Sequence, residues 1–150
     1  MKQVLIAVDG SPASDEAVDV GLDLAGAEGA AVTFVHVAPT VQLAVGSYLT
    51  VSVPVPVEEL SAADEDAVLV RAAACAAEQG VEAKVVEQYG VPAEAIAAVA
   101  DTVAADVIVI GSRGLGALGR AVLGSTSRKL LSQTGRPVLV VRAAKAPVPA

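Results

Sequence analysis

The feature that most constrains the fold is an alternation of short apolar runs with longer amphipathic stretches along the 150 residues. Runs of about four to eight apolar residues, rich in β-branched types, indicate buried strands, and apolar residues at helical spacing indicate helices. Strands are expected at residues 3–8, 31–37, 81–88, 106–110 and 138–142, and helices at residues 12–29, 58–79, 92–103 and 118–134. Five strands that alternate with four helices predict an α/β fold with a parallel sheet and right-handed crossovers.

Local signals place some of the element ends. Ser11-Pro12 is a typical helix start, because a serine at the N-cap accepts a backbone hydrogen bond and a proline fits the first helical turn. Gly135-Arg136-Pro137 is expected to end the last helix. Residues 81–88 alternate between apolar and charged types, which predicts a half-exposed strand at an edge of the sheet.

Composition narrows the class of protein. At this length the chain is most simply one domain, and with aromatic residues at 2% its core is built from Ala, Val, Leu and Ile. The single cysteine, Cys75, excludes an internal disulfide framework and is expected to be a small buried apolar residue, which suits a reducing, cytoplasmic location.

Charge is divided unevenly along the chain. Residues 1–106 hold all 17 acidic residues and three of the ten basic ones, and residues 107–150 hold the other basic residues. A net charge of −7 with one basic segment predicts a small anionic ligand and no nucleic acid partner, because nucleic-acid-binding domains are usually basic and often carry stacking aromatics.

Residues 37–57 contain no charged residue, which raises the question of a membrane segment. Pro39, Pro54 and Pro56 argue against a spanning helix, so no membrane span is expected. We interpret Ala38–Val57 as a long apolar loop that covers a ligand or packs on another subunit. The apolar run Val4–Val8 is too short for the core of a secretion signal.

The stretch Asp106–Thr126 carries three overlapping glycine patterns. Gly114–Gly119 satisfies G-x-G-x-x-G, but no acidic residue follows Asp106, so the ribose-binding carboxylate of a dinucleotide site is missing. Gly119–Thr126 resembles a P-loop that has serine in place of lysine, which argues against an ordinary P-loop ATPase. The third pattern, G-x2-G-x9-G-S from Gly111 to Ser125, has every element in place.

This third pattern resembles the ATP-binding signature of the universal stress protein family. The resemblance covers nearly the whole chain, through the stretches VLIAVDGS, VTFVHV, GVPAEAI, DVIVIGSRG and RPVLVVR. It implies a single-domain, three-layer, Rossmann-like sandwich (adenine nucleotide alpha hydrolase-like) over residues 1–142 with strand order 3-2-1-4-5, followed by a flexible tail at residues 143–150. It also implies a homodimer formed through the exposed edge of the strand Val138–Arg142.

In the implied strand order the ends of the first and fourth strands lie side by side, at a topological switch point where such sheets bind ligands. Asp9 and Gly111 end those two strands. Asp9 either accepts hydrogen bonds from a ribose and helps to hold Mg²⁺ carried by ATP, or supports the cap of the first helix. The ATP phosphates are expected at the loop residues Gly111, Ser112, Gly114, Gly124, Ser125 and Thr126.

Arg113, Ala7 and Val37 admit two interpretations each. Arg113 either contacts a phosphate or lies in solvent. Ala7 and Val37 are implied by the resemblance to line an adenine slot, and both suit an ordinary core equally well. His36, the only histidine, is interpreted as a packed core residue.

Three functions remain open at this stage. The first is an ATP-binding regulatory module of the stress response, favoured by a complete glycine pattern with no acid–base pair or nucleophile dyad among its positions. The second is a slow ATP-hydrolysing enzyme in which Asp9 places the metal. The third is a nucleotide-free dimeric interaction protein that works through Ala38–Val57.

Overall fold

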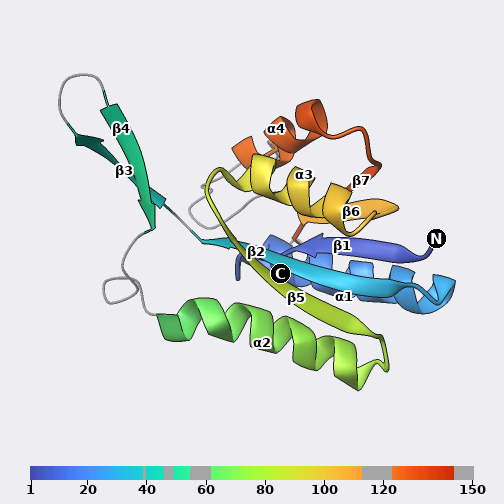
Figure 1. The fold of residues 1–150 in the computed structure, drawn as a ribbon. Coiled ribbons are helices and arrows are strands. Elements are labelled where there is room, and N and C mark those ends of the chain that lie inside the picture. The colour runs from blue at the N-terminus through green and yellow to red at the C-terminus, as the bar shows by residue number, and fades with distance from the viewer. Residues whose placement is uncertain (39, 46–48, 55–61, 113–122, 144–150) are drawn as a thin grey trace, which may run out of the picture.

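In the computed structural model, which describes residues 1–38, 40–45, 49–54, 62–112 and 123–143, a five-stranded parallel sheet lies between two layers of helices (Figure 1). The strands are β1 Gln3–Ala7, β2 Ala31–Ala38, β5 Ala83–Tyr89, β6 Val107–Gly111 and β7 Val138–Val141. The helices are α1 Pro12–Glu28, α2 Ala62–Glu78, α3 Pro92–Thr102 and α4 Ser125–Gln133. The sheet order β5-β2-β1-β6-β7 is 3-2-1-4-5 in chain order, so the predicted α/β class and strand order are confirmed.

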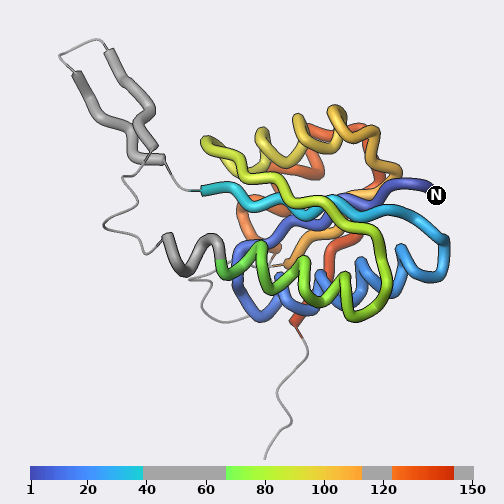
Figure 2. The backbone as a smooth tube through the Cα atoms, turned by 60° about the horizontal axis from the view of Figure 1, so that its bottom comes forward, coloured from blue at the N-terminus to red at the C-terminus, as the bar shows by residue number. Residues whose placement is uncertain are grey.

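Each face of the sheet is covered by one pair of helices. Val4 and Ile6 of β1 pack in the core cluster that includes residues of α1 and α2, and Leu5 packs in the cluster that includes residues of α3 and α4. The alternation along one strand therefore fills two separate cores. Figure 2 shows the two layers from another side, with blue α1 and the green part of α2 opposite yellow α3 and orange α4.

Helix α1 begins and ends as the sequence predicts. Ser11 is the N-cap, and its Oγ accepts a hydrogen bond from the Ser14 amide at 3.2 Å. Pro12 is the first helical residue, and Gly29 closes the helix in the left-handed region with φ 64°. Glycine populates that region without a steric penalty, so this position suits a helix end.

The last expected helix is wrong at its start. The last helix was expected from about Leu118, but α4 begins at Ser125 and residues 123–124 are not helical. The apolar residues before Gly124 favoured a longer helix, and the backbone break at Gly124 sets the start. Part of the glycine loop, residues 113–122, lies outside the described residues, as does the predicted tail beyond residue 143.

The expected apolar loop Ala38–Val57 is also wrong, because it contains a β-hairpin. Strand β3 Thr40–Val45 pairs antiparallel with β4 Leu49–Pro54, and the two form a separate two-stranded sheet (Figure 1). Alternating apolar and polar residues in both segments are the physical reason for the strands.

The two edges of the parallel sheet are formed by β5 and β7. β5 lies at one edge of the sheet, as predicted for residues 81–88, and its residues are half-buried or exposed, although the expected alternation breaks where Lys84 and Val85 are both exposed. β7 forms the opposite edge. Among the described helices, none has both the length and the apolar character needed to cross a lipid bilayer.

Candidate functional site

The candidate site lies where β1 and β6 end, because these two strands are neighbours in the centre of the sheet. Ile6 of β1 pairs with Val109 of β6, so Asp9 and Gly111 follow at the same end of adjacent strands. As predicted, these two positions therefore lie together at the carboxyl ends of neighbouring strands. This end of the sheet is the topological switch point at which sheets of this kind bind ligands.

Gly111 lies directly against the first turn of α1. A Cβ atom at this position would sit 2.7 Å from the carbonyl carbon of Ala13 and 2.9 Å from the amide nitrogen of Ser14. Ser127, in the first turn of α4, donates a hydrogen bond from its buried Oγ to the Gly111 carbonyl at 3.0 Å. The N-termini of α1 and α4 therefore meet at the end of β6, and both bring the positive end of a helix dipole to that point.

The chain on either side of the glycine loop is fastened by backbone hydrogen bonds. The Ser112 amide donates to the Val141 carbonyl at 2.6 Å, and the Gly124 amide donates to the Ser112 carbonyl at 2.6 Å. These bonds bring the two halves of the glycine pattern together at one place. They also occupy the Gly124 amide, so the amides next available for an anion are those that follow it in α4.

The start of α4 has no side-chain cap within the described part of the chain. Gly124 is its N-cap residue and supplies no side-chain hydrogen bond to the first turn, and no acidic residue lies in that turn. Ser125 is exposed and Thr126 is half-buried, so both residues border solvent. Uncapped first-turn amides together with two hydroxyl groups form an arrangement that suits phosphate oxygens.

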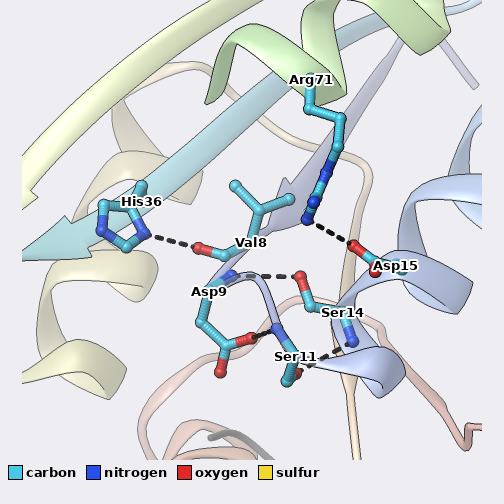
Figure 3. A network of polar contacts seen from close by, with 7 residues as sticks. All are labelled: Val8, Asp9, Ser11, Ser14, Asp15, His36 and Arg71. Atoms are coloured by element: carbon cyan, nitrogen blue, oxygen red, sulfur yellow. Dashed lines mark hydrogen bonds and ion pairs between the residues drawn. The ribbon is translucent and has the colours of Figure 1, made fainter. Parts of the chain in front are cut away.

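Asp9 combines a structural role with a potential ligand-binding role (Figure 3). Its Oδ1 accepts a hydrogen bond from the Ser11 amide at 2.9 Å, and its own amide donates to Ser14 Oγ at 3.1 Å. These contacts shape the turn before α1, as the capping interpretation predicts. Among the residues described by the structure, Oδ2 has no hydrogen-bond donor, which leaves one carboxylate oxygen for a ligand or a cation.

The two residues implied for adenine lie in the same half of the molecule. Ala7 is buried and Val37 is half-buried, and both belong to the apolar cluster between the sheet and the α3/α4 layer. Their placement fits either interpretation made from the sequence. Arg113 and Gly114 fall on residues outside the described ranges, so the structure does not place them.

His36 is buried, as the sequence predicts, and it holds the end of β1. Its Nδ1 donates to the Val8 carbonyl at 2.8 Å, immediately before Asp9 (Figure 3). Its Nε2 is buried without a hydrogen-bond partner among the described residues. We did not predict this buried, unpaired ring nitrogen from the sequence. The sequence around a single histidine in an apolar strand does not reveal which groups its ring will contact.

Another hollow lies between α1 and α2, away from the glycine loop. It has a volume of about 200 Å³ and is lined by Val8, Ser14, Asp15, Val18, Asp19, Val68, Arg71, Ala72 and Cys75. Arg71 bridges it through an exposed ion pair with Asp15 at 3.1 Å. Cys75 is half-buried, less enclosed than the sequence predicts. The described residues contain no group of three His, Cys, Asp or Glu side chains able to hold a metal ion.

Comparisons with known proteins identify the family. The sequence model of the universal stress protein family matches residues 1–142, and the chain belongs to this family. It is 34% identical to the universal stress protein YxiE of Bacillus subtilis, covering 93% of this chain and 98% of that protein. It is 38% identical to a universal stress protein of Thermus aquaticus, with 94% and 98% covered.

Solved structures of the family share the fold. A universal stress protein crystallised in complex with cAMP superposes with a TM-score of 0.69 at 25% identity, covering 95% of this chain and 98% of that one. A universal stress protein from Burkholderia pseudomallei superposes with a TM-score of 0.71 at 24% identity, covering 95% and 96%.

Proposed function

We propose that this chain binds an adenine nucleotide, with ATP as the first candidate, and that occupancy of the site regulates the protein. The observation that carries the proposal is the meeting of two helix N-termini at the end of β6, one of them without a side-chain cap. Helix N-termini bind phosphates because their free amides and their dipole both favour negative charge. The cAMP complex of a related universal stress protein supports the choice of adenine.

Each residue of the proposed site has a distinct task. The amides and hydroxyls of Ser125 and Thr126 bind phosphate oxygens, with Ser112, Arg113, Gly114 and Gly124 completing the loop. Ala7 and Val37 border the adenine ring, and Asp9 accepts hydrogen bonds from the ribose. One carboxylate whose Oδ2 has no donor among the described residues also fits Mg²⁺ that arrives with ATP, because Mg²⁺ is usually held by one or two carboxylates and the phosphates of the nucleotide.

The site favours binding over bond breaking. Among the site residues that the structure describes, the side chains supply one carboxylate and hydroxyl groups, without a histidine or lysine placed to act as an acid or base. Phosphoryl transfer needs a metal and a positioned nucleophile, so any hydrolysis depends on Asp9 and on water. We therefore expect nucleotide binding with slow turnover at most.

Calorimetric titration of the protein with MgATP, AMP and adenosine tests the proposal. Ser125→Asp adds a negative charge beside the uncapped amides, which suits the helix dipole but repels phosphate, so ATP affinity should fall about tenfold or more while stability is kept. Ser125→Asn is the neutral matched control and should keep most of the affinity. Absence of binding by all three compounds would favour the nucleotide-free dimer, and release of phosphate above the buffer rate that requires Asp9 would favour the enzyme.

A further inference from the structure

The hollow between α1 and α2 has an apolar floor. Val8 after β1, Val18 of α1 and Ala72 of α2 are buried there. Val68 and Cys75 of α2, which are half-buried, complete the apolar part. A volume of about 200 Å³ is below the roughly 300–1,000 Å³ of pockets for drug-sized ligands, but it exceeds the roughly 150 Å³ of a cavity that holds benzene. The hollow therefore suits a small apolar group.

The mouth of the same hollow is charged. Arg71 of α2 reaches across to Asp15 of α1, with 3.1 Å between guanidinium nitrogen and carboxylate oxygen, so these two charges offset each other (Figure 3). Asp19, one turn further along α1, also lines the hollow and is exposed. Its carboxylate forms no hydrogen bond or ion pair with any residue that the structure describes. The mouth therefore has a net negative charge beside an apolar floor.

The rest of α1 strengthens this negative charge. The helix contains no lysine or arginine, and Asp15, Asp19 and Asp23 follow one another at intervals of four residues. Like charges at this spacing lie next to each other on a helix and destabilise it. A cation bound at the mouth would relieve this repulsion, whereas an anion would add to it. The ligand that fits the hollow is therefore a cation with a small apolar body.

We propose that the hollow between α1 and α2 binds a small alkyl amine, with its carbon chain on the apolar floor and its ammonium group beside Asp19. An alkyl amine is protonated at neutral pH, as the lysine side chain is. A lysine side chain likewise lays its carbon stem on apolar surface and keeps its charged end in water. Exposed ion pairs are weak and the ligand is small, so we expect a dissociation constant of about 1 mM. The proposal does not rest on nucleotide binding.

Three probes with the same six-carbon chain separate the contribution of charge from that of the apolar floor. We titrate the intact protein, without nucleotide, with hexylamine, hexanol and hexanoate, and follow the methyl resonances of Val18 and Val68 by NMR. Val99, buried in the cluster on the other face of the sheet, is the internal reference. Hexylamine should bind about threefold more tightly than hexanol and about tenfold more tightly than hexanoate, with little change at Val99.

Two substitutions at the mouth should change the affinity for hexylamine in opposite directions. Asp19→Asn removes the carboxylate beside the ammonium group and should weaken binding about threefold, to the level of hexanol. Arg71→Gln releases Asp15 from its ion pair and should strengthen binding by a similar factor. Asp23→Asn is the matched control, because Asp23 is equally exposed on the next turn of α1 but does not line the hollow.

Thermal unfolding of the three variants checks that the fold is kept, as expected for substitutions of exposed side chains. Methyl resonances of Val18 and Val68 that do not respond to hexylamine would overturn the proposal. Equal affinity for hexylamine and hexanoate would overturn the role of the charged mouth, and so would equal effects of Asp19→Asn and Asp23→Asn. A response of Val99 as large as that of Val18 would mean that the probe acts on the protein as a whole.

Discussion

Gly111 packs so closely on Ala13 that a methyl group at position 111 would lie 2.7 Å from the Ala13 carbonyl carbon. This contact joins the end of β6 to the first turn of α1, and it explains the glycine without reference to a ligand. The sequence interpretation assigned Gly111 to phosphate binding. The structure adds a packing role, in which the lack of a side chain allows two backbones to touch.

Replacing Gly111 by alanine should therefore destabilise the whole domain. The overlapping atoms belong to the backbone, so no side-chain rotation relieves the clash, and we expect a loss of about 3 kcal/mol, at the upper end for overpacked sites. Urea unfolding measures this loss. Gly135→Ala is the control, because nothing lies within 4 Å of a Cβ atom there. Equal unfolding midpoints for the two variants would contradict the close packing.

The Asp9 carboxylate should couple nucleotide affinity to Mg²⁺. Asp9→Asn keeps an oxygen for the Ser11 amide but removes the negative charge, so ATP affinity measured with Mg²⁺ should fall about tenfold and affinity measured without Mg²⁺ should change little. Asp15→Asn is the control, because Asp15 forms only an exposed ion pair with Arg71. An Mg²⁺ dependence in Asp9→Asn equal to that of the wild type would remove Asp9 from the metal site.

The imidazole ring of His36 should carry its proton on Nδ1. Nδ1 lies 2.8 Å from the Val8 carbonyl, which can only accept a hydrogen bond. The neutral ring therefore leaves Nε2 as a bare acceptor in a buried position. Nitrogen-15 chemical shifts of the ring distinguish the two tautomers. A ring that carries its proton on Nε2 alone would mean that the contact with Val8 is not a hydrogen bond.

Asp106 should make stability depend on pH in the acidic range. Backbone hydrogen bonds from Lys2 at 2.6 Å and Gln3 at 2.9 Å hold the pKa of Asp106 below its ordinary value of 3.8, with a smaller contribution from Arg136. A lowered folded-state pKa stabilises the protein above pH 3.8, and this stabilisation is lost as pH falls through the folded-state value. The carboxylate thus fastens the start of β1 to the start of β6.

Asp106→Asn tests this dependence directly. The variant should be less stable than the wild type at pH 7, and the difference between their urea midpoints should shrink towards zero as the pH is lowered below the folded-state pKa. Asp101→Asn is a useful control, because Asp101 is exposed and pairs with Arg136. A difference between wild type and Asp106→Asn that stays constant from pH 7 to pH 3 would contradict the hydrogen bonds to the two amides.

Much of the fold follows from local sequence patterns. The unbroken apolar runs at residues 4–8 and 107–110 are buried because only the centre of a parallel sheet hides both faces of a strand. The Ser11-Pro12 start of α1 is observed because its capping interactions lie within one turn. The alternation of Val41, Leu43 and Val45 is also typical of a strand, but we predicted a loop because the segment contains prolines and no charged residue.

The contacts of the candidate site are less visible in the sequence. Ser14 and Ser127 bond Asp9 and Gly111 through side chains whose partners are set by how the helices pack, so no motif marks them. The bond between the Gly124 amide and the Ser112 carbonyl likewise depends on how the loop closes. Residue types and spacing thus locate the site, and tertiary packing decides which amides remain available.

The edge strand β7 provides the last prediction, a homodimer through Val138–Arg142. β7 pairs with β6 on one side only, and Leu139 is 38% exposed. An apolar edge without a lysine in the strand favours pairing with another chain.

We expect the amides of β7 to gain protection from hydrogen exchange as protein concentration rises, and Leu139→Lys to abolish that gain because a charge would enter the shared edge. Val85→Lys on β5, the opposite edge, is the control for an added lysine, since Val85 is 50% exposed. β7 amides that exchange at the same rate at every concentration would exclude the edge-strand dimer.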